Sequence, residues 1–120
     1  MPRYTGYMSY YEDCFKNGLL SYVDAVSTHP YSSFAPEIRL FQLGQLRRLI
    51  DRYAPPGKQI PLISSEDGYT TVGEASGTPP LGGFTDEALQ ARYLPRVFLT
   101  HWMSGGESCT TFLVFTAHAL

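Results

Sequence analysis

Apolar residues recur at helical spacing in three parts of the chain. The first part covers about residues 8–18 and ends at Asn17-Gly18, a plausible C-terminal cap. The second runs from Pro36 to about residue 53, and the third extends from Thr85 to the Gly105-Gly106 pair. The expected buried face of the second helix comprises Ile38, Phe41, Leu46, Leu49, Ile50 and Tyr53. The expected buried face of the third comprises Leu89, Tyr93, Leu94, Val97, Phe98 and Trp102.

The charged residues of the second helix and the proline of the third lead to two further expectations. Arg39 and the other charged residues of the second helix mostly fall off its apolar stripe, so they are expected on a solvated face. Pro95 lies inside the third helix, where it is expected to kink the helix or to break it near Leu94.

Short apolar runs predict strands at residues 22–29, 60–66 and 110–116. The first strand should stop near His29, because Pro30 cannot donate a backbone hydrogen bond. Helices and strands then alternate in one α/β domain, residues 1–120. Since consecutive parallel strands are joined by right-handed crossovers, the first two strands should end at the same edge of the sheet.

Polar residues stand where the first two predicted strands end. Glu66 follows the apolar run from Ile60 to Ile63, and the ends of parallel strands are where α/β folds place their chemistry. His29, Tyr31 and Tyr69 are expected to share a cleft with Glu66. In the alternative interpretation Glu66 is a solvated loop carboxylate or a helix cap.

Composition narrows the functional classes. A hydrophobic content of 43% with 17% charged residues is typical of a folded domain. The net charge of −2 and the lack of a basic run argue against nucleic-acid binding, and no apolar stretch reaches the roughly 20 residues that span a bilayer. The cysteines and histidines show no metal-ligand spacing, so neither a metal nor another cofactor is expected. Two free thiols and no signal-peptide pattern favour a cytoplasmic location.

Four segments resemble a known family: residues 15–31, 46–53, 60–69 and the helix at 84–103. They look like the C-terminal half of a clan-A retaining glycoside hydrolase, a (β/α)8 barrel of the cellulase and β-xylosidase type. The resemblance covers about residues 10–104, and residues 105–120 diverge from it. It implies that the first two strands are barrel strands six and seven, that Glu66 is the nucleophile, and that the substrate-binding residues are His29, Tyr31, Asp67 and Tyr69.

The chain departs from this family in length and at the acid/base position. A complete barrel needs about 250 residues, so 120 residues form about a quarter to three-eighths of one. Retaining hydrolysis uses two carboxyl groups about 5–5.5 Å apart. The second could be Asp67 if the strand has ended before it, Glu74 in the long loop, or a carboxylate of a neighbouring subunit. Asp67 also stands where the family often has an aromatic residue.

These observations predict a partial barrel that is completed by association into a homo-oligomer, a dimer or a tetramer. The function expected from the resemblance is hydrolysis of β-glycosidic bonds with a carbohydrate substrate. One alternative is a carbohydrate-binding fragment without catalysis. Another is a truncated product that is stable only as an oligomer and binds no ligand.

Overall fold

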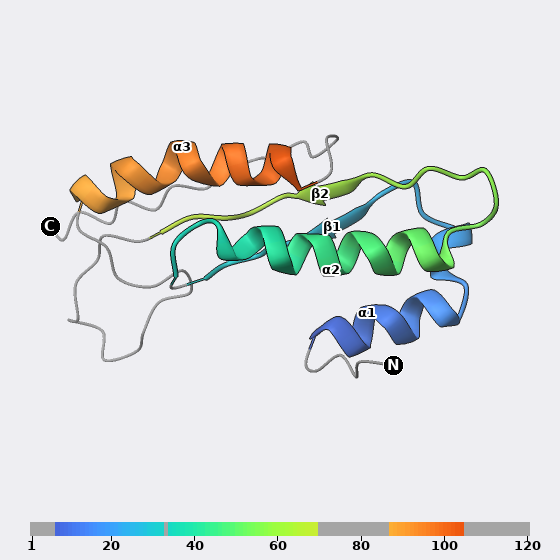
Figure 1. Cartoon of the computed structure of the whole chain (residues 1–120). Coiled ribbons are helices and arrows are strands. Elements are labelled where there is room, and N and C mark those ends of the chain that lie inside the picture. Colours follow the sequence, from blue (N-terminus) through green and yellow to red (C-terminus); the bar gives the residue numbers. More distant parts are fainter. Residues whose placement is uncertain (1–6, 33, 70–86, 105–120) are drawn as a thin grey trace, which may run out of the picture.

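The computed structural model of the chain is a small α/β fold in which helices cover a parallel sheet (Figure 1). It describes residues 7–32, 34–69 and 87–104. Within these ranges the elements are α1 (Tyr7–Lys16), the 3-10 helix η1 (Leu19–Ser21), β1 (Val26–Thr28), α2 (Ile38–Tyr53), β2 (Leu62–Ser64) and α3 (Glu87–Met103). The predicted alternation is confirmed as far as α3. The predicted strand at 110–116, the helix start at Thr85 and the glycine pair at 105–106 lie outside the described residues.

The chain leaves α1 through a glycine, as the Asn17-Gly18 sequence predicts. Gly18 adopts a left-handed backbone with φ of +85°, a conformation that costs glycine little because it has no Cβ. Its N–H donates to the carbonyl of Phe15 at 3.0 Å and so satisfies one of the last acceptors of the helix. The chain then turns through η1 into β1.

The strands β1 and β2 pair in parallel and in register. The aligned residues are Val26 with Leu62, Ser27 with Ile63 and Thr28 with Ser64. Both strands therefore end at the same edge of the sheet, which confirms the prediction. The residues that follow β1 and β2 are His29 and Ser65. The backbone N–H of Ser65 still donates to the carbonyl of Thr28 at 3.3 Å.

The two faces of the sheet differ in burial. Alternate residues of a strand point to opposite faces, and Val26, Thr28, Leu62 and Ser64 are buried while Ser27 is exposed. Figure 1 shows α2 along the sheet, with α1 on one side of α2 and α3 on the other. The core residues of the described part are Met8, Phe15, Leu20, Val26, Leu43, Leu46, Leu49, Ile50, Ile60 and Leu62.

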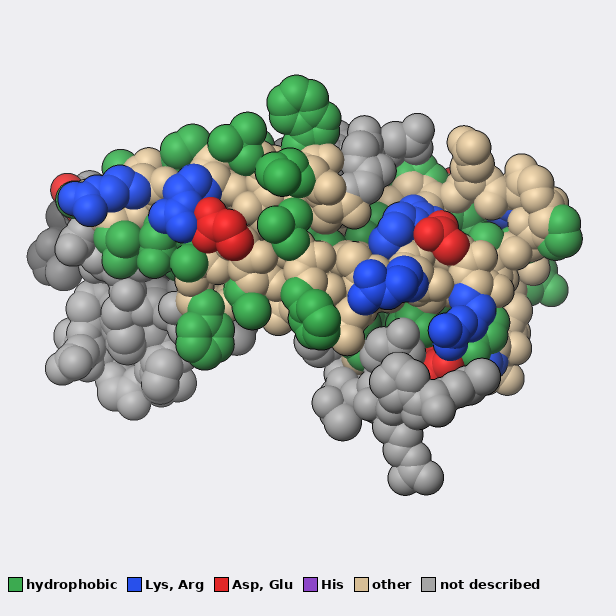
Figure 2. All heavy atoms as spheres, viewed as in Figure 1, with side chains coloured by type: hydrophobic (Ala, Val, Ile, Leu, Met, Phe, Trp, Pro, Cys, Tyr) green, Lys and Arg blue, Asp and Glu red, His purple; other side chains and the backbone are tan. Residues whose placement is uncertain are grey.

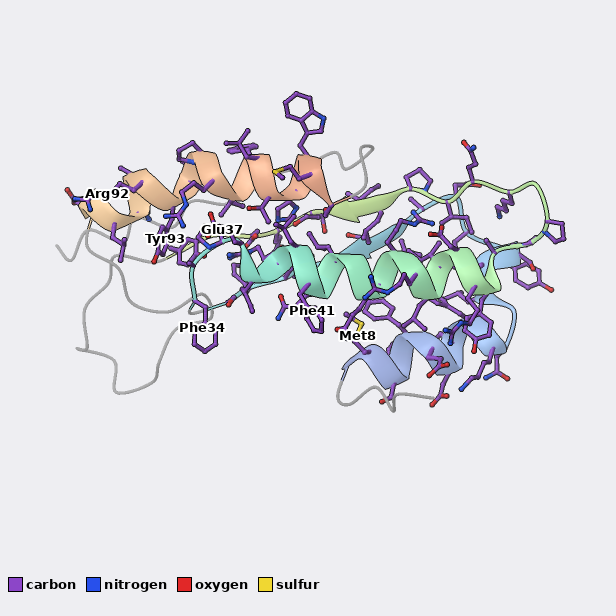
Figure 3. The ribbon with its side chains drawn as sticks, in the orientation of Figure 1. Met8, Phe34, Glu37, Phe41, Arg92 and Tyr93 are labelled. Carbon is purple, nitrogen blue, oxygen red and sulfur yellow. The ribbon has the colours of Figure 1, made fainter. Side chains whose placement is uncertain are left out.

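The buried face of α2 differs from the prediction in its first half. Arg39 is fully buried together with Leu43, Leu46, Leu49 and Ile50, whereas Ile38 is exposed and Phe41 is 62% exposed. Figure 3 shows Phe41 pointing away from the sheet. The prediction for Arg39 was wrong because positions 39, 43, 46 and 50 fall on one side of a helix. The Asp67 carboxylate neutralises the buried guanidinium.

The α3 helix also departs from the prediction. It runs unbroken through Pro95, so of the two expected effects, a kink or a break near Leu94, the break is absent. The helix packs against α2. Val97, Thr100 and His101 are buried, but Phe98 is exposed and Trp102 is 71% exposed. Each step along a helix turns by about 100°, so the residues next to Val97 and His101 turn away from the core. No helix in the described ranges has the length and apolar character needed to cross a membrane.

Candidate functional site

The candidate site lies at the carboxyl ends of β1 and β2. His29 and Tyr31 follow β1, and Ser65 and Glu66 follow β2. Because the strands are parallel and in register, their ends bring these four residues to one edge of the sheet. The sequence had predicted this meeting for three of the four residues.

Two side chains approach the Glu66 carboxylate. The Tyr31 hydroxyl donates a hydrogen bond to Glu66 Oε2 at 3.2 Å, and His29 Nδ1 lies 3.6 Å from the same oxygen. The side chains of Glu66 and His29 are 38% and 49% exposed. The carboxylate is therefore oriented by the protein and is still open to a ligand.

The Tyr31 phenol is held in its donor form. Burial raises the pKa of Tyr31, and the neighbouring negative charge of Glu66 raises it further. The phenol therefore keeps its proton at neutral pH. It acts on Glu66 as a neutral hydrogen-bond donor.

Two serines extend the site along the exposed face of the sheet. His29 Nε2 lies 2.9 Å from Ser65 Oγ, and Ser65 Oγ lies 2.6 Å from Ser27 Oγ. The sequence interpretation missed both serines. A signal was present, because Ser27 and His29 are two residues apart and so share one face of β1, while the register brings Ser65 alongside them.

A pocket of about 520 Å³ adjoins the site on the β1 side. It is lined by Tyr11, Ser27, Thr28, His29, Pro30, Tyr31 and Gln42. His29 and Tyr31 thus line the pocket and contact Glu66. Gln42 Oε1 is buried and accepts no hydrogen bond from the described part of the chain, so this wall of the pocket suits an occupant that carries a hydrogen-bond donor.

Asp67 faces the interior instead of the open edge. Its Oδ1 accepts hydrogen bonds from Arg39 Nη2 at 2.6 Å and from the Gly68 N–H at 2.7 Å. Its Oδ2 lies 2.5 Å from Arg39 Nε and 3.0 Å from His101 Nε2. All three side chains are buried, so Asp67 joins the segment after β2 to α2 and α3.

Tyr69 belongs to the same buried group. Its hydroxyl donates to the carbonyl of Phe34 at 2.6 Å and accepts from Arg39 Nη1 at 2.5 Å, and its ring packs on Tyr93 with the centroids 4.8 Å apart. Burial raises the pKa of Tyr69, although the Arg39 charge opposes this rise. We call Arg39, Asp67, Tyr69 and His101 the Arg39 cluster.

The described structure therefore divides the five predicted site residues into two groups. Glu66, His29 and Tyr31 contact one another at the open edge. Asp67 and Tyr69 lie behind that edge, where protein groups occupy their polar atoms, so a substrate could reach them only if the Arg39 cluster opened. The predicted substrate contact of these two residues stays a prediction.

The described residues show neither a second carboxyl group bonded to Glu66 nor a metal site. Asp67 points away from Glu66, and Glu74 lies outside the described ranges. Within those ranges no three side chains of histidine, cysteine, aspartate or glutamate gather as metal ligands would. Cys14 is a free thiol.

Comparisons with protein-family models, with curated proteins and with solved structures find no match to this chain.

Proposed function

We propose that the chain is a glycoside hydrolase that cleaves β-glycosidic bonds by a retaining mechanism, with Glu66 as the nucleophile. The observation that carries this proposal is the placement of Glu66. Its carboxylate stands at the end of a parallel strand, is partly exposed, accepts a hydrogen bond from Tyr31 and has His29 beside it. A sugar at this edge would meet one oriented carboxylate and two ring side chains.

The chemistry of this residue follows from the retaining mechanism. Glu66 would attack the anomeric carbon as the bond to the leaving oxygen breaks, and a covalent glycosyl-enzyme would form. A carboxylic acid would protonate the leaving oxygen and would later deprotonate the water that releases the sugar. Tyr31 and His29 would fix the position of Glu66 and contact the sugar hydroxyls.

The acid/base carboxyl group must come from another part of the chain or from a second copy. Asp67 does not supply it, because Arg39 and His101 hold both of its oxygens in the interior. Glu74 or a carboxylate of a second copy remain candidates. We propose that copies of this partial barrel associate into a dimer or a tetramer, since a parallel sheet with one open face needs a cover for it.

Covalent trapping tests this proposal directly. A panel of activated 2-deoxy-2-fluoro-β-glycosides should form a sugar ester on Glu66, which peptide mass spectrometry would locate. Glu66→Gln should abolish the adduct and the turnover of aryl β-glycosides. Asp24→Asn removes an exposed carboxylate away from the site and should react like the parent chain. Turnover that Glu66→Gln leaves unchanged would eliminate the proposal.

A non-catalytic carbohydrate-binding protein is the second candidate. It is favoured by the single carboxylate that the described residues place at the open edge. In this case isothermal titration should detect sugar binding that Tyr31→Phe weakens, without the steady heat of hydrolysis. Continuous heat release would rule against this candidate.

A further inference from the structure

The open edge also holds a serine, a histidine and a carboxylate in sequence. Ser65 Oγ lies 2.9 Å from His29 Nε2, and His29 Nδ1 lies 3.6 Å from Glu66 Oε2. A nucleophile beside a base that a third group orients is the arrangement of serine hydrolases on unrelated folds. We propose that Ser65, His29 and Glu66 form a nucleophilic triad that hydrolyses small carboxylic esters, an activity distinct from glycoside cleavage.

The Ser65–His29 hydrogen bond can take the direction that this role requires. The Glu66 carboxylate makes an electrostatic contact with His29 Nδ1 at 3.6 Å, and the His29 tautomer that suits this contact carries its proton on Nδ1. His29 Nε2 is then an acceptor, and Ser65 can donate its hydroxyl proton to it. Ser27 in turn can donate to Ser65 Oγ at 2.6 Å. In this tautomer the Ser65 hydroxyl can direct its proton at the base that would remove it.

An ester could reach this triad. His29 and Glu66 are about half and over a third exposed, and Ser65 is half-buried. The 520 Å³ pocket lined by Ser27, His29 and Tyr31 lies beside the triad and has room for an acyl group. In this proposal the backbone N–H of Glu66, the residue that follows the nucleophile, would donate to the oxyanion.

A second histidine–carboxylate pair in the described residues shows why the triad is proposed at the open edge. His101 Nε2 lies 3.0 Å from Asp67 Oδ2, a closer approach than that of His29 to Glu66. Both of its members are buried, and Asp67 already neutralises Arg39. That pair has a structural role, whereas the pair at the open edge has a hydroxyl nucleophile and access to solvent.

The reaction needs only the ester and water. Ser65 Oγ bonds to the acyl carbon as its proton moves to His29 Nε2, and His29 returns that proton to the alcohol as the ester C–O bond breaks. Water then attacks the acyl carbon and gives a proton to His29. Ser65 leaves with this proton, and the products are a carboxylic acid and an alcohol.

An active-site phosphonate tests the proposal on the full chain. A fluorophosphonate should phosphonylate Ser65 of the parent chain, and peptide mass spectrometry would locate the label. The parent chain should also hydrolyse 4-nitrophenyl acetate. Ser65→Ala should remove the label. His29→Asn should slow labelling by about a hundredfold or more, as expected when a general base is lost. Ser21→Ala, at an exposed serine of η1, should label at the parent rate.

The outcomes separate this proposal from the glycosidase. A phosphonyl group on Ser65 supports the triad whether or not a fluoroglycoside reacts at Glu66, because the two reagents report on different atoms. A folded chain, confirmed by circular dichroism, that takes no label at Ser65 would overturn the triad. Labelling that His29→Asn leaves unchanged would do so as well.

Discussion

At the residue scale, the Arg39 cluster is the least expected feature of the chain. Arg39 and Asp67 are both fully buried, and removing charges from water is costly. The cost is offset because the guanidinium and the carboxylate meet through two pairs of atoms while His101 and the Gly68 N–H fill the remaining acceptor positions. The cluster fixes the backbone of the residue that follows Glu66.

Removing one charge of this pair should strongly destabilise the fold. Arg39→Met leaves Asp67 buried without its main partner, so we expect a loss of about 3–5 kcal/mol in the free energy of unfolding. Urea denaturation would measure it, with Arg48→Met as the control, since Arg48 is exposed on the same helix. A loss below about 1 kcal/mol, the usual range of a surface ion pair, would contradict the burial of this charge.

The hydrogen bond from Tyr31 to Glu66 gives a second prediction at this scale. Tyr31→Phe removes one donor to a charged acceptor, a bond worth about 1.5–3 kcal/mol. If Glu66 is the nucleophile, fluoroglycoside trapping at Glu66 should slow by about tenfold to a hundredfold. Tyr22→Phe is the control, since this ring is exposed beyond η1. Equal trapping rates in the two variants would show that Tyr31 does not orient the carboxylate.

At the element scale, α3 is attached to the start of α2 by a surface ion pair as well as by the Arg39 cluster. Arg96 Nε and Nη2 donate to the two oxygens of Glu37 at 2.8 and 2.7 Å. Figure 3 shows Glu37 between the beginning of α2 and the α3 side chain Tyr93, whose ring lies under the Arg96 guanidinium. The hydrogen bonds from Arg96 lower the pKa of Glu37.

The lowered pKa fixes the pH dependence of this pair. A carboxyl group with a depressed pKa stabilises the fold above its ordinary pKa, and the stabilisation is lost as the pH falls through the depressed value. Glu37→Gln should cost no more than about 1 kcal/mol at neutral pH, because the pair is exposed and screened. Urea denaturation at several pH values should show the difference from the parent chain vanishing in acid. A difference that stays constant with pH would count against the ion pair, and Asp24→Asn is the matched exposed control.

At the scale of the whole molecule, apolar side chains remain uncovered on one side of α3. Figure 2 shows hydrophobic side chains along this helix, and the large exposed ones are Phe98, Leu99, Trp102 and Met103. Two neighbouring pairs, one turn apart, form a continuous strip on a helix. Such a strip, together with a sheet that has an exposed face, favours association between copies.

Sedimentation tests the expected association. The parent chain should sediment as a dimer or a tetramer, and Trp102→Glu should shift it toward the monomer because the substitution places a charge in the apolar strip. Tyr22→Glu puts the same charge on an isolated exposed ring and should leave the mass unchanged. A stable parent monomer at micromolar concentration would contradict the prediction.

The order of the elements and the position of Glu66 could be predicted from the sequence. Helical spacing, the Asn17-Gly18 stop and the apolar run before Glu66 are local signals, and local backbone preferences are enough to express them. The shared end of β1 and β2 followed as well, since the crossover rule depends only on chain handedness. These signals are enough to predict that His29, Tyr31 and Glu66 meet.

Only the tertiary structure decided which side is buried in the first half of α2 and in the last turns of α3, and which polar groups pair. Arg39 is charged and Trp102 is apolar, yet the first is buried and the second exposed, because the partner across the interface sets the cost of burial. The Ser65–His29 contact joins residues 36 positions apart. Such pairings depend on the register and packing of distant segments, which no local pattern contains.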